Sequence, residues 1–401
     1  MMRRFAASLV LALGAAAPAG AVDWVPVFDA SFLMGQVLQG GKASSWQGNA
    51  ALQFTPAVKF TDELGLIPTY YGTYRGTKSA VDLGSGGQLF QDSQSHALSL
   101  KGVWKRDEWK VKPSLGYRWE LLRETSDEGW GKGLFDYRKP SAGLEVERAF
   151  GERVRAGAAF DYYEIQFPNY RSLESQALPG LGRELAEGRT LDSRSYSWTL
   201  TGHFPLPFEG GAARLTGNFT RRGYPEQHVV QASGSLADDT RADDFSSVSA
   251  ALSYGRALAP RVGGYLSLEF TQLRDASNQN HYDAEQARFL GQYYSYDERS
   301  LYPKLTMILG EKKVELAVGY LQVWRDYLGR AAQDASGTYL NESTRLDQGS
   351  FTFDLSLPLA HGFKALAHTT LTDASSNMRY EKTYRYNYQL SSHLLGFSYT
   401  F

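Results

Sequence analysis

The sequence predicts an all-β protein, a closed antiparallel transmembrane β-barrel of about sixteen strands, within a range of about 14 to 18. Three observations predict this fold. Apolar and polar residues alternate along most of the chain, short and long connections take turns between the alternating segments, and the last alternating segment runs to the final residue. A barrel in a bilayer produces this alternation because each strand has one face in lipid and the other in water.

The clearest alternation lies in residues 108–121, EWKVKPSLGYRWEL, where apolar side chains occupy nearly all the odd positions from Trp109 to Leu121. Polar residues such as Lys110 and Lys112 lie between them. A soluble β-sandwich shows a similar alternation, so this pattern alone does not choose between the two folds. The same pattern recurs in residues 52–60, 196–204, 266–271 and 350–357.

The connections favour the barrel, because transmembrane barrels have short periplasmic turns and longer outer loops. We expect a first strand at about residues 28–39 and an even number of strands. An even number places both termini of the barrel domain on the same side of the membrane. Short turns are predicted at 61–64, 106–108, 151–153, 206–210, 259–261, 310–313 and 361–362. Longer polar loops are predicted at 78–92, 124–134, 169–189, 225–242, 276–290 and 329–344, with shorter ones at 41–46 and 375–380.

The first residues have the pattern of a cleaved secretory signal peptide. Arg3 and Arg4 precede the apolar run 5–17, and small residues follow it at 19–21. We therefore expect a signal peptide at residues 1–21 and one barrel domain at residues 22–401. No stretch of eighteen apolar residues follows, so no spanning helix is predicted. The chain has no cysteine, which excludes disulfides.

The final strand also indicates where the protein functions. Apolar residues alternate with small or polar ones in HLLGFSYTF, residues 393–401. This stretch resembles the C-terminal signature of Gram-negative outer-membrane β-barrel proteins, although His393 stands where an apolar residue is usual. The resemblance implies location in the cell outer membrane and insertion by the barrel-assembly machinery, which would recognise Leu395, Phe397, Tyr399 and Phe401. Upstream, the apolar parity switches at Tyr384, Tyr386, Tyr388 and Leu390, which predicts a bulge or mixed facing near residues 391–394.

Composition and motifs disfavour both a nucleic-acid partner and an enzyme. The formal charge of −1 argues against a nucleic-acid partner. No Gly-x-Ser-x-Gly motif occurs, and the residues that follow His368 lack the spacing of the outer-membrane phospholipase motif. Without cysteines or paired histidines, we expect no metal, no cofactor and no catalytic residue. The seven histidines are scattered, at His96, His203, His228, His281, His361, His368 and His393.

Polar residues that alternate with the apolar stripe should face the lumen. On adjacent strands they form a basic wall, and acidic residues line other parts, so that opposed charges would select solutes by size and charge. The alternative is that these charges form ion pairs that plug a narrow barrel. The predicted pore-lining residues are Lys101, Lys105, Lys110, Lys112, Arg118, Glu120, Glu145, Arg155, Asp161, Arg214, Glu269 and Asp354.

Two predicted loops have compositions that suggest a function. Loop 169–189 is rich in leucine, so we expect it to fold into the lumen as a constriction, with a cap over neighbouring loops as the equal alternative. Its charged residues are Glu174, Arg183, Glu184 and Glu187. The acidic segment 237–245, with Asp238, Asp239, Asp243 and Asp244, could bind Ca²⁺ or bridge lipopolysaccharide, but a solvated loop is favoured.

The sequence therefore favours a channel for passive diffusion of small hydrophilic solutes or ions. The expected partners are outer-membrane lipid and lipopolysaccharide, and a homo-oligomer is left open. An alternative is a barrel of an export or surface-assembly system, since residues 375–401 resemble loosely the last hairpin of barrels in surface-lipoprotein assembly modifiers. The helical repeat domain of those proteins is missing here. A hydrolase at the rim is the least favoured alternative.

Overall fold

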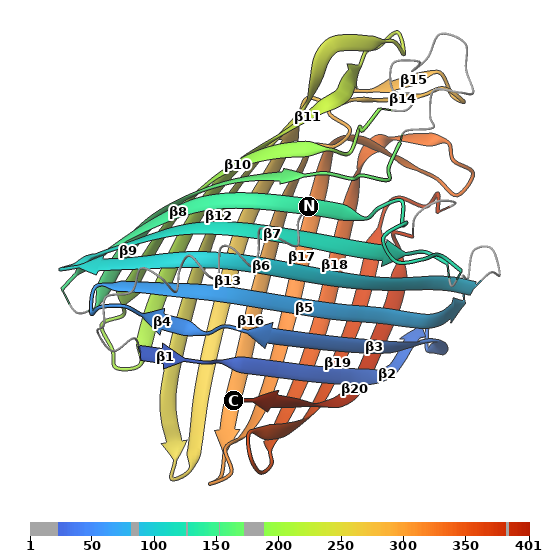
Figure 1. Ribbon diagram of the computed structural model, residues 1–401. Helices are drawn as coiled ribbons and strands as arrows, with labels where there is room; N and C mark the ends of the chain where they lie inside the picture. The colour runs from blue at the N-terminus through green and yellow to red at the C-terminus, as the bar shows by residue number, and fades with distance from the viewer. Residues whose placement is uncertain (1–22, 82–87, 126, 152, 172–187, 382–384) are drawn as a thin grey trace.

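The computed structural model describes residues 23–81, 88–125, 127–151, 153–171, 188–381 and 385–401. Sixteen strands follow one another around a closed antiparallel barrel (Figure 1). The fold class and the strand count predicted from the sequence are confirmed. The predicted signal peptide lies outside the described residues. No described segment is a helix long and apolar enough to cross a membrane.

Each barrel strand pairs with the strands before and after it in the chain. The barrel strands are β2 (Phe28–Gln39), β3 (Lys42–Phe54), β5 (Leu64–Val81), β6 (Gln88–Arg106), β7 (Trp109–Arg123), β8 (Tyr137–Phe150), β9 (Val154–Ile165), β10 (Ser193–Pro205), β11 (Gly211–Val230), β12 (Leu236–Ala259), β13 (Val262–Ser277), β16 (Tyr296–Leu309), β17 (Val314–Gln333), β18 (Tyr339–Pro358), β19 (Phe363–Ser376) and β20 (Tyr388–Thr400). Short strands β1 (Asp23–Val25) and β4 (Ala57–Lys59) pair at one end, and β14 (His281–Asp283) and β15 (Arg288–Leu290) form a separate hairpin.

The barrel closes between β2 and β20, which lie side by side in Figure 1. Their register runs without a shift from the pair Asp29 and Thr400 to the pair Gln39 and Leu390. The backbone of Phe28 also exchanges hydrogen bonds of 3.0 and 2.9 Å with that of Phe401. Closure leaves no free edge along these strands, which is a requirement for a sheet surrounded by lipid.

The parity change near residues 391–394 is mixed facing and not a bulge. The register between β19 and β20 is continuous from Tyr388 to Tyr399. Leu390 and Leu394 therefore lie on the face opposite to Leu395, and Leu394 is buried.

Large apolar side chains cover one face of the sheet and are exposed. Leu395, Leu200 and Val248 are 69%, 65% and 62% exposed. The buried apolar residues in the described part of the chain are few and mostly small, so the sheet encloses no dry core such as a β-sandwich has. They are Leu290, Ala317, Ala332, Ala374, Met378 and Leu394. The apolar face is the outer face of the barrel, and lipid covers it.

The predicted short turns are present at one end of the barrel as far as the structure describes them, since residue 152 of the turn at 151–153 lies outside the described residues. Several use the left-handed backbone region that tight hairpins need, as at Asp107 (φ 51°), Gly151 (φ 66°) and Arg261 (φ 69°). By the loop asymmetry of bacterial barrels this end faces the periplasm. The protein is thus an outer-membrane β-barrel whose longer connections lie on the cell exterior.

Four of the predicted outer loops are wrong in extent, because strand pairing continues into them. The loop predicted at 78–92 is shortened at both ends, since β5 continues to Val81 and β6 begins at Gln88. The loop predicted at 41–46 is a two-residue turn at Gly40 and Gly41, both with positive φ. The loop predicted at 225–242 is reduced to residues 231–235, and that at 329–344 to residues 334–338. Backbone pairing persists there although the apolar alternation has stopped.

Candidate functional site: the inner wall

The strand registers place all twelve predicted pore-lining residues on the inner face. In an antiparallel pair, directly opposite residues point to the same side of the sheet. On β6, β7 and β8, for example, Lys101 lies opposite Ser114, and Lys112 lies opposite Glu145. Their chain neighbours Leu100 and Leu144 belong to the outer apolar face.

The basic residues of β6 and β7 are paired with acids of β8. Lys112 Nζ lies 2.9 Å from Glu145 Oε1 and 2.7 Å from Glu147 Oε1. Lys101 Nζ reaches across β7 to lie 3.4 Å from Glu145 Oε2. Basic and acidic side chains therefore share this part of the wall, where the sequence had suggested separate basic and acidic walls.

Two lysines nearer the periplasm form a different arrangement. Lys105 and Lys110 are directly opposite each other on β6 and β7. Within the described residues neither has an ion-pair partner. Like charges in this position repel each other, so the pair favours a nearby anion.

Farther from the periplasmic end of the same strands, Arg118 makes polar contacts with its neighbours. Its Nε donates to Ser95 Oγ at 2.7 Å and lies 3.9 Å from Glu120 Oε2. Glu120 in turn accepts a hydrogen bond of 2.7 Å from the Tyr137 hydroxyl. These contacts fix a cation and an anion side by side on the inner wall.

A second charged sector lies on β9 to β13. Arg214 Nη2 on β11 spans β12 to reach Glu269 Oε2 on β13, at 3.2 Å. Both residues line a cavity of about 580 Å³ at the periplasmic half of the wall. Arg155 lies opposite His203 on β10, and the carboxylate of Asp161 lies over Gly143.

The inner wall also contains a chain of hydrogen bonds on β18 and β19. His368 Nδ1 lies 2.5 Å from Asp354 Oδ1, and its Nε2 lies 2.9 Å from the Thr370 hydroxyl. Asp354 and His368 are direct partners in the register. The order acid, imidazole, hydroxyl is that of a nucleophilic triad, although a structural histidine in a polar wall makes the same contacts.

A cluster at the outer end of the wall was missed by the sequence prediction. Arg241 forms a bidentate pair with Asp243, with Nε to Oδ1 at 3.0 Å and Nη2 to Oδ2 at 2.8 Å. Its guanidinium lies 4.6 Å from the ring centre of Tyr224 and 4.5 Å from that of Tyr294. Asp243 is 1% exposed. The pair was assigned to a loop because apolar alternation is absent around it.

Two more arginines continue this cluster along β17. Arg325 pairs with Glu298 of β16, with Nη2 to Oε2 at 2.5 Å, and lies over the Tyr296 ring. Arg330 lies 4.4 Å from the ring centre of Tyr293. Burial raises the pKa of the Tyr293 phenol in the outer loop, so this ring stays neutral beside the guanidinium.

Two further predictions from the sequence concern the acidic segment and the constriction loop. The acidic loop at 237–245 is wrong, because these residues belong to β12. Asp238 and Asp239 are exposed, while Asp243 pairs with Arg241 and Asp244 lies 3.9 Å from Arg221 on the outer face. No group of acids or histidines in the described chain is arranged to hold a metal ion. The predicted constriction residues Glu174, Arg183, Glu184 and Glu187 lie outside the described residues.

No protein-family model matches this chain, and no curated protein matches it in sequence. Solved structures resemble it weakly along nearly its whole length. Acinetobacter baumannii OccAB3 has 10% identity and a TM-score of 0.47, over 94% of this chain and 99% of that one. Pseudomonas aeruginosa OccD3 (OpdP) has 10% identity and a TM-score of 0.45, over 96% and 93%. A bacterial polysaccharide outer membrane secretin has 9% identity and a TM-score of 0.45, over 94% and 98%.

Proposed function

We propose that this outer-membrane barrel is a channel for passive diffusion of small hydrophilic solutes or ions. The observation that supports this function is the row of ionised side chains along the inner wall, from Lys105 and Lys110 near the periplasm to Arg325 and Glu298 near the exterior. Charged groups are costly to bury without water, so this wall favours a wet lumen. Barrels of sixteen strands are wide enough to enclose an aqueous channel.

The charges on β6 to β8 support a modest preference for anions. Six basic residues and three acidic residues face inward there, a difference of three positive charges. The cations are Lys101, Lys105, Lys110, Lys112, Arg118 and Lys139, and the anions are Glu120, Glu145 and Glu147. Because the acids pair with Lys101 and Lys112, and Lys139 lies over the Tyr163 ring, Lys105 and Lys110 contribute most to this preference.

Planar-bilayer recording of the purified protein tests the proposal. We expect steady open steps at low voltage and a reversal potential under a KCl gradient that indicates chloride preference. Substitution of Lys105 and Lys110 by glutamine should reduce that preference and leave the open steps in place. If the folded protein gives no conductance steps in planar bilayers, the passive pore is contradicted. The alternative, a barrel that conducts only with an export or surface-assembly partner, would then be favoured.

Among the described residues, the contacts of His368 with Asp354 and Thr370 are the observation that favours a hydrolase. A p-nitrophenyl ester assay on the wild type and on Thr370→Val distinguishes this function from the channel. For a channel, we expect no hydrolysis above background and unchanged conductance in the variant.

A further inference from the structure

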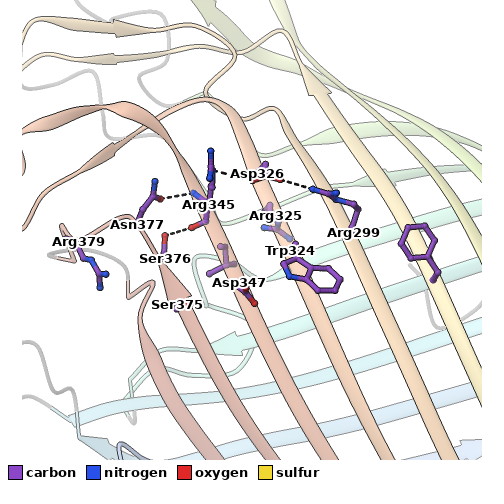
Figure 2. A pocket seen from close by; sticks show the side chains of 12 residues that line it. Arg299, Trp324, Arg325, Asp326, Arg345, Asp347, Ser375, Ser376, Asn377 and Arg379 are labelled. Carbon is purple, nitrogen blue, oxygen red and sulfur yellow. Dashed lines mark hydrogen bonds and ion pairs between the residues drawn. The ribbon is translucent and has the colours of Figure 1, made fainter.

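A charged cluster lies on the outer face of the barrel, beyond the apolar belt. Arg299 of β16, Asp326 of β17 and Arg345 of β18 have the same outward orientation as Leu301, Tyr320 and Phe351. Arg299 Nη2 lies 3.3 Å from Asp326 Oδ2, and Arg345 Nε lies 3.7 Å from Asp326 Oδ1. Figure 2 shows the two guanidinium groups on either side of this carboxylate.

The cluster lies next to aromatic side chains. Trp324 is directly opposite both Arg299 and Asp347 in the register, and Phe270 lines the same hollow. The hollow has a volume of about 760 Å³. One part of it is therefore apolar and another part is cationic.

The height of the cluster matches the headgroup layer. Asp347 is eleven residues from the periplasmic end of β18 at Pro358, which corresponds to roughly 30 Å along the membrane normal for a tilted strand. This exceeds the apolar band of about 25 Å of outer-membrane barrels. Arg299 and Arg345 are thus placed just outside the hydrocarbon, where anionic headgroups lie.

The charges of the cluster are not balanced within the protein. Arg299 and Arg345 share one carboxylate, and their side chains remain 54% and 74% exposed. Arg379 adds a third guanidinium to the lining and Asp347 a second carboxylate, so Arg299, Arg345 and Arg379 exceed these acids by one positive charge. A planar guanidinium donates two parallel hydrogen bonds to a phosphate, so exposed arginines at this height favour a phosphorylated ligand.

We propose that this hollow binds a phosphorylated glycolipid of the outer leaflet, with a phosphate on Arg299 and Arg345 and an acyl chain against Trp324 and Phe270. A second copy of the protein is a poorer occupant, because a two-fold contact on this patch would place arginines against arginines. Free phosphate would leave the aromatic part of the hollow uncovered.

Native mass spectrometry in detergent tests this site with bis-phosphorylated lipid A as the probe. We expect Arg299→Gln combined with Arg345→Gln to weaken lipid A binding at least about tenfold, since hydrogen bonds to charged groups are lost. The matched control is Arg148→Gln combined with Arg256→Gln, which removes two arginines of the same outer face at the periplasmic end. This control should bind lipid A like the wild type.

Further measurements distinguish a phosphorylated lipid from free phosphate as the ligand. Lipid A stripped of its phosphates should bind the wild type as weakly as intact lipid A binds the double variant, and inorganic phosphate should not compete at millimolar concentration. Asp326→Asn keeps both arginines and should bind lipid A at least as tightly as the wild type. Folding of every variant is checked by the mobility of unheated protein in gel electrophoresis.

Equal binding of lipid A by the wild type and the arginine variant would overturn the proposal. So would equal loss in both double variants, or loss in Asp326→Asn. Lipid-independent dimers that disappear only in the Arg299 and Arg345 variant would assign the patch to a second copy instead.

Discussion

Lys112 holds two glutamates on the inner wall, and this arrangement determines how much of its charge a permeating ion meets. With Glu145 and Glu147 in place, the ammonium group is nearly neutralised at contacts of 2.9 and 2.7 Å. Lys101 shares Glu145, so removal of the two carboxylates would release two cations into the lumen.

We predict that Glu145→Gln combined with Glu147→Gln raises the permeability of chloride relative to potassium by about threefold or more. A unit charge about 6 Å from an ion in water changes its energy by ~0.7 kcal/mol, which is a factor of ~3. The measurement is the reversal potential under a KCl gradient. The matched control is Glu108→Gln combined with Glu311→Gln, in exposed periplasmic turns, which should leave the ratio unchanged. An unaltered ratio in both variants would show that ions do not pass near Lys112.

The Arg241 and Asp243 pair is a second residue-scale feature with a measurable consequence. Asp243 is 1% exposed and Arg241 is 15% exposed at its side chain, and Ser277 donates a further hydrogen bond to the carboxylate. Removal of one partner leaves the other charge buried without compensation, which is strongly destabilising.

We predict that Asp243→Ala lowers the free energy of unfolding by ~3 kcal/mol. Asp238→Ala, on the same strand but exposed, should change it by less than about 0.5 kcal/mol. Urea unfolding in lipid vesicles, followed by tryptophan fluorescence, measures both values. Equal stability of the two variants would mean that water reaches Asp243.

At the scale of the elements, the sequence predicts strands well where they cross the membrane and poorly beyond it. Within the bilayer one face meets lipid and the other water, so apolar and polar residues must alternate. Beyond it both faces meet water, and the alternation disappears while the backbone hydrogen bonds continue. Residues 225–230 and 339–344 are strand for this reason, although their composition predicts loop, and their pairing with the neighbouring strand contains register shifts.

The same reasoning explains what could be predicted of the candidate pore. The facing of Lys101 or Arg214 follows from the parity of its strand, so it is predictable from one sequence. Contacts across an intervening strand, as between Arg214 and Glu269, depend on the stagger of three strands. Hydrophobic patterns set that stagger only to within a residue or two, so these pairs could not be foreseen.

The short loop between β17 and β18 gives a prediction of pH dependence. Asp334 Oδ1 accepts hydrogen bonds from Ser336 Oγ at 2.6 Å, Ser336 N at 2.9 Å and Thr338 N at 3.0 Å. The Ser336 side-chain hydrogen bond, followed by the backbone ones, lowers the pKa of this carboxyl below its ordinary value. Its contribution to loop stability is therefore present above the pKa of the unfolded chain, and is lost as the pH falls through the lowered pKa.

We predict that amide protection of residues 334–338 decreases on acidification below about pH 4, after correction for intrinsic exchange rates. Hydrogen exchange with mass spectrometry measures this protection. Asp334→Asn should remove the dependence on pH. The loop at 231–235 is an internal control, because Ser233, Ser235 and Gln231 close it without a carboxylate. A parallel loss in both loops would indicate general opening of the outer end.

At the scale of the whole molecule, stability depends on closure between β2 and β20. Two glycines lie at this contact, and neither has room for a larger residue. A Cβ atom on Gly35 would lie 1.8 Å from the carbonyl oxygen of His393, and one on Gly396 would lie 1.8 Å from that of Phe32. In contrast, a Cβ atom on Gly48, in the neighbouring strand β3, would have no atom within 4 Å. Closure therefore requires glycine at both positions.

We predict that Gly396→Ala impairs closure while Gly48→Ala does not. The added methyl group meets partner backbone, so it must push β2 and β20 apart, at a cost of ~3 kcal/mol or more. Both substitutions replace a strand glycine by alanine and have the same effect on the unfolded chain, so their difference isolates the contact between the strands. We expect a reduced fraction of Gly396→Ala with the mobility of folded barrel in unheated gel electrophoresis, and a lower urea midpoint for the part that folds. Gly35→Ala should behave in the same way from the opposite strand. If all three variants fold and unfold like the wild type, β2 and β20 are farther apart in the membrane than in this structure, and the closed wall on which a selective pore depends would be lost.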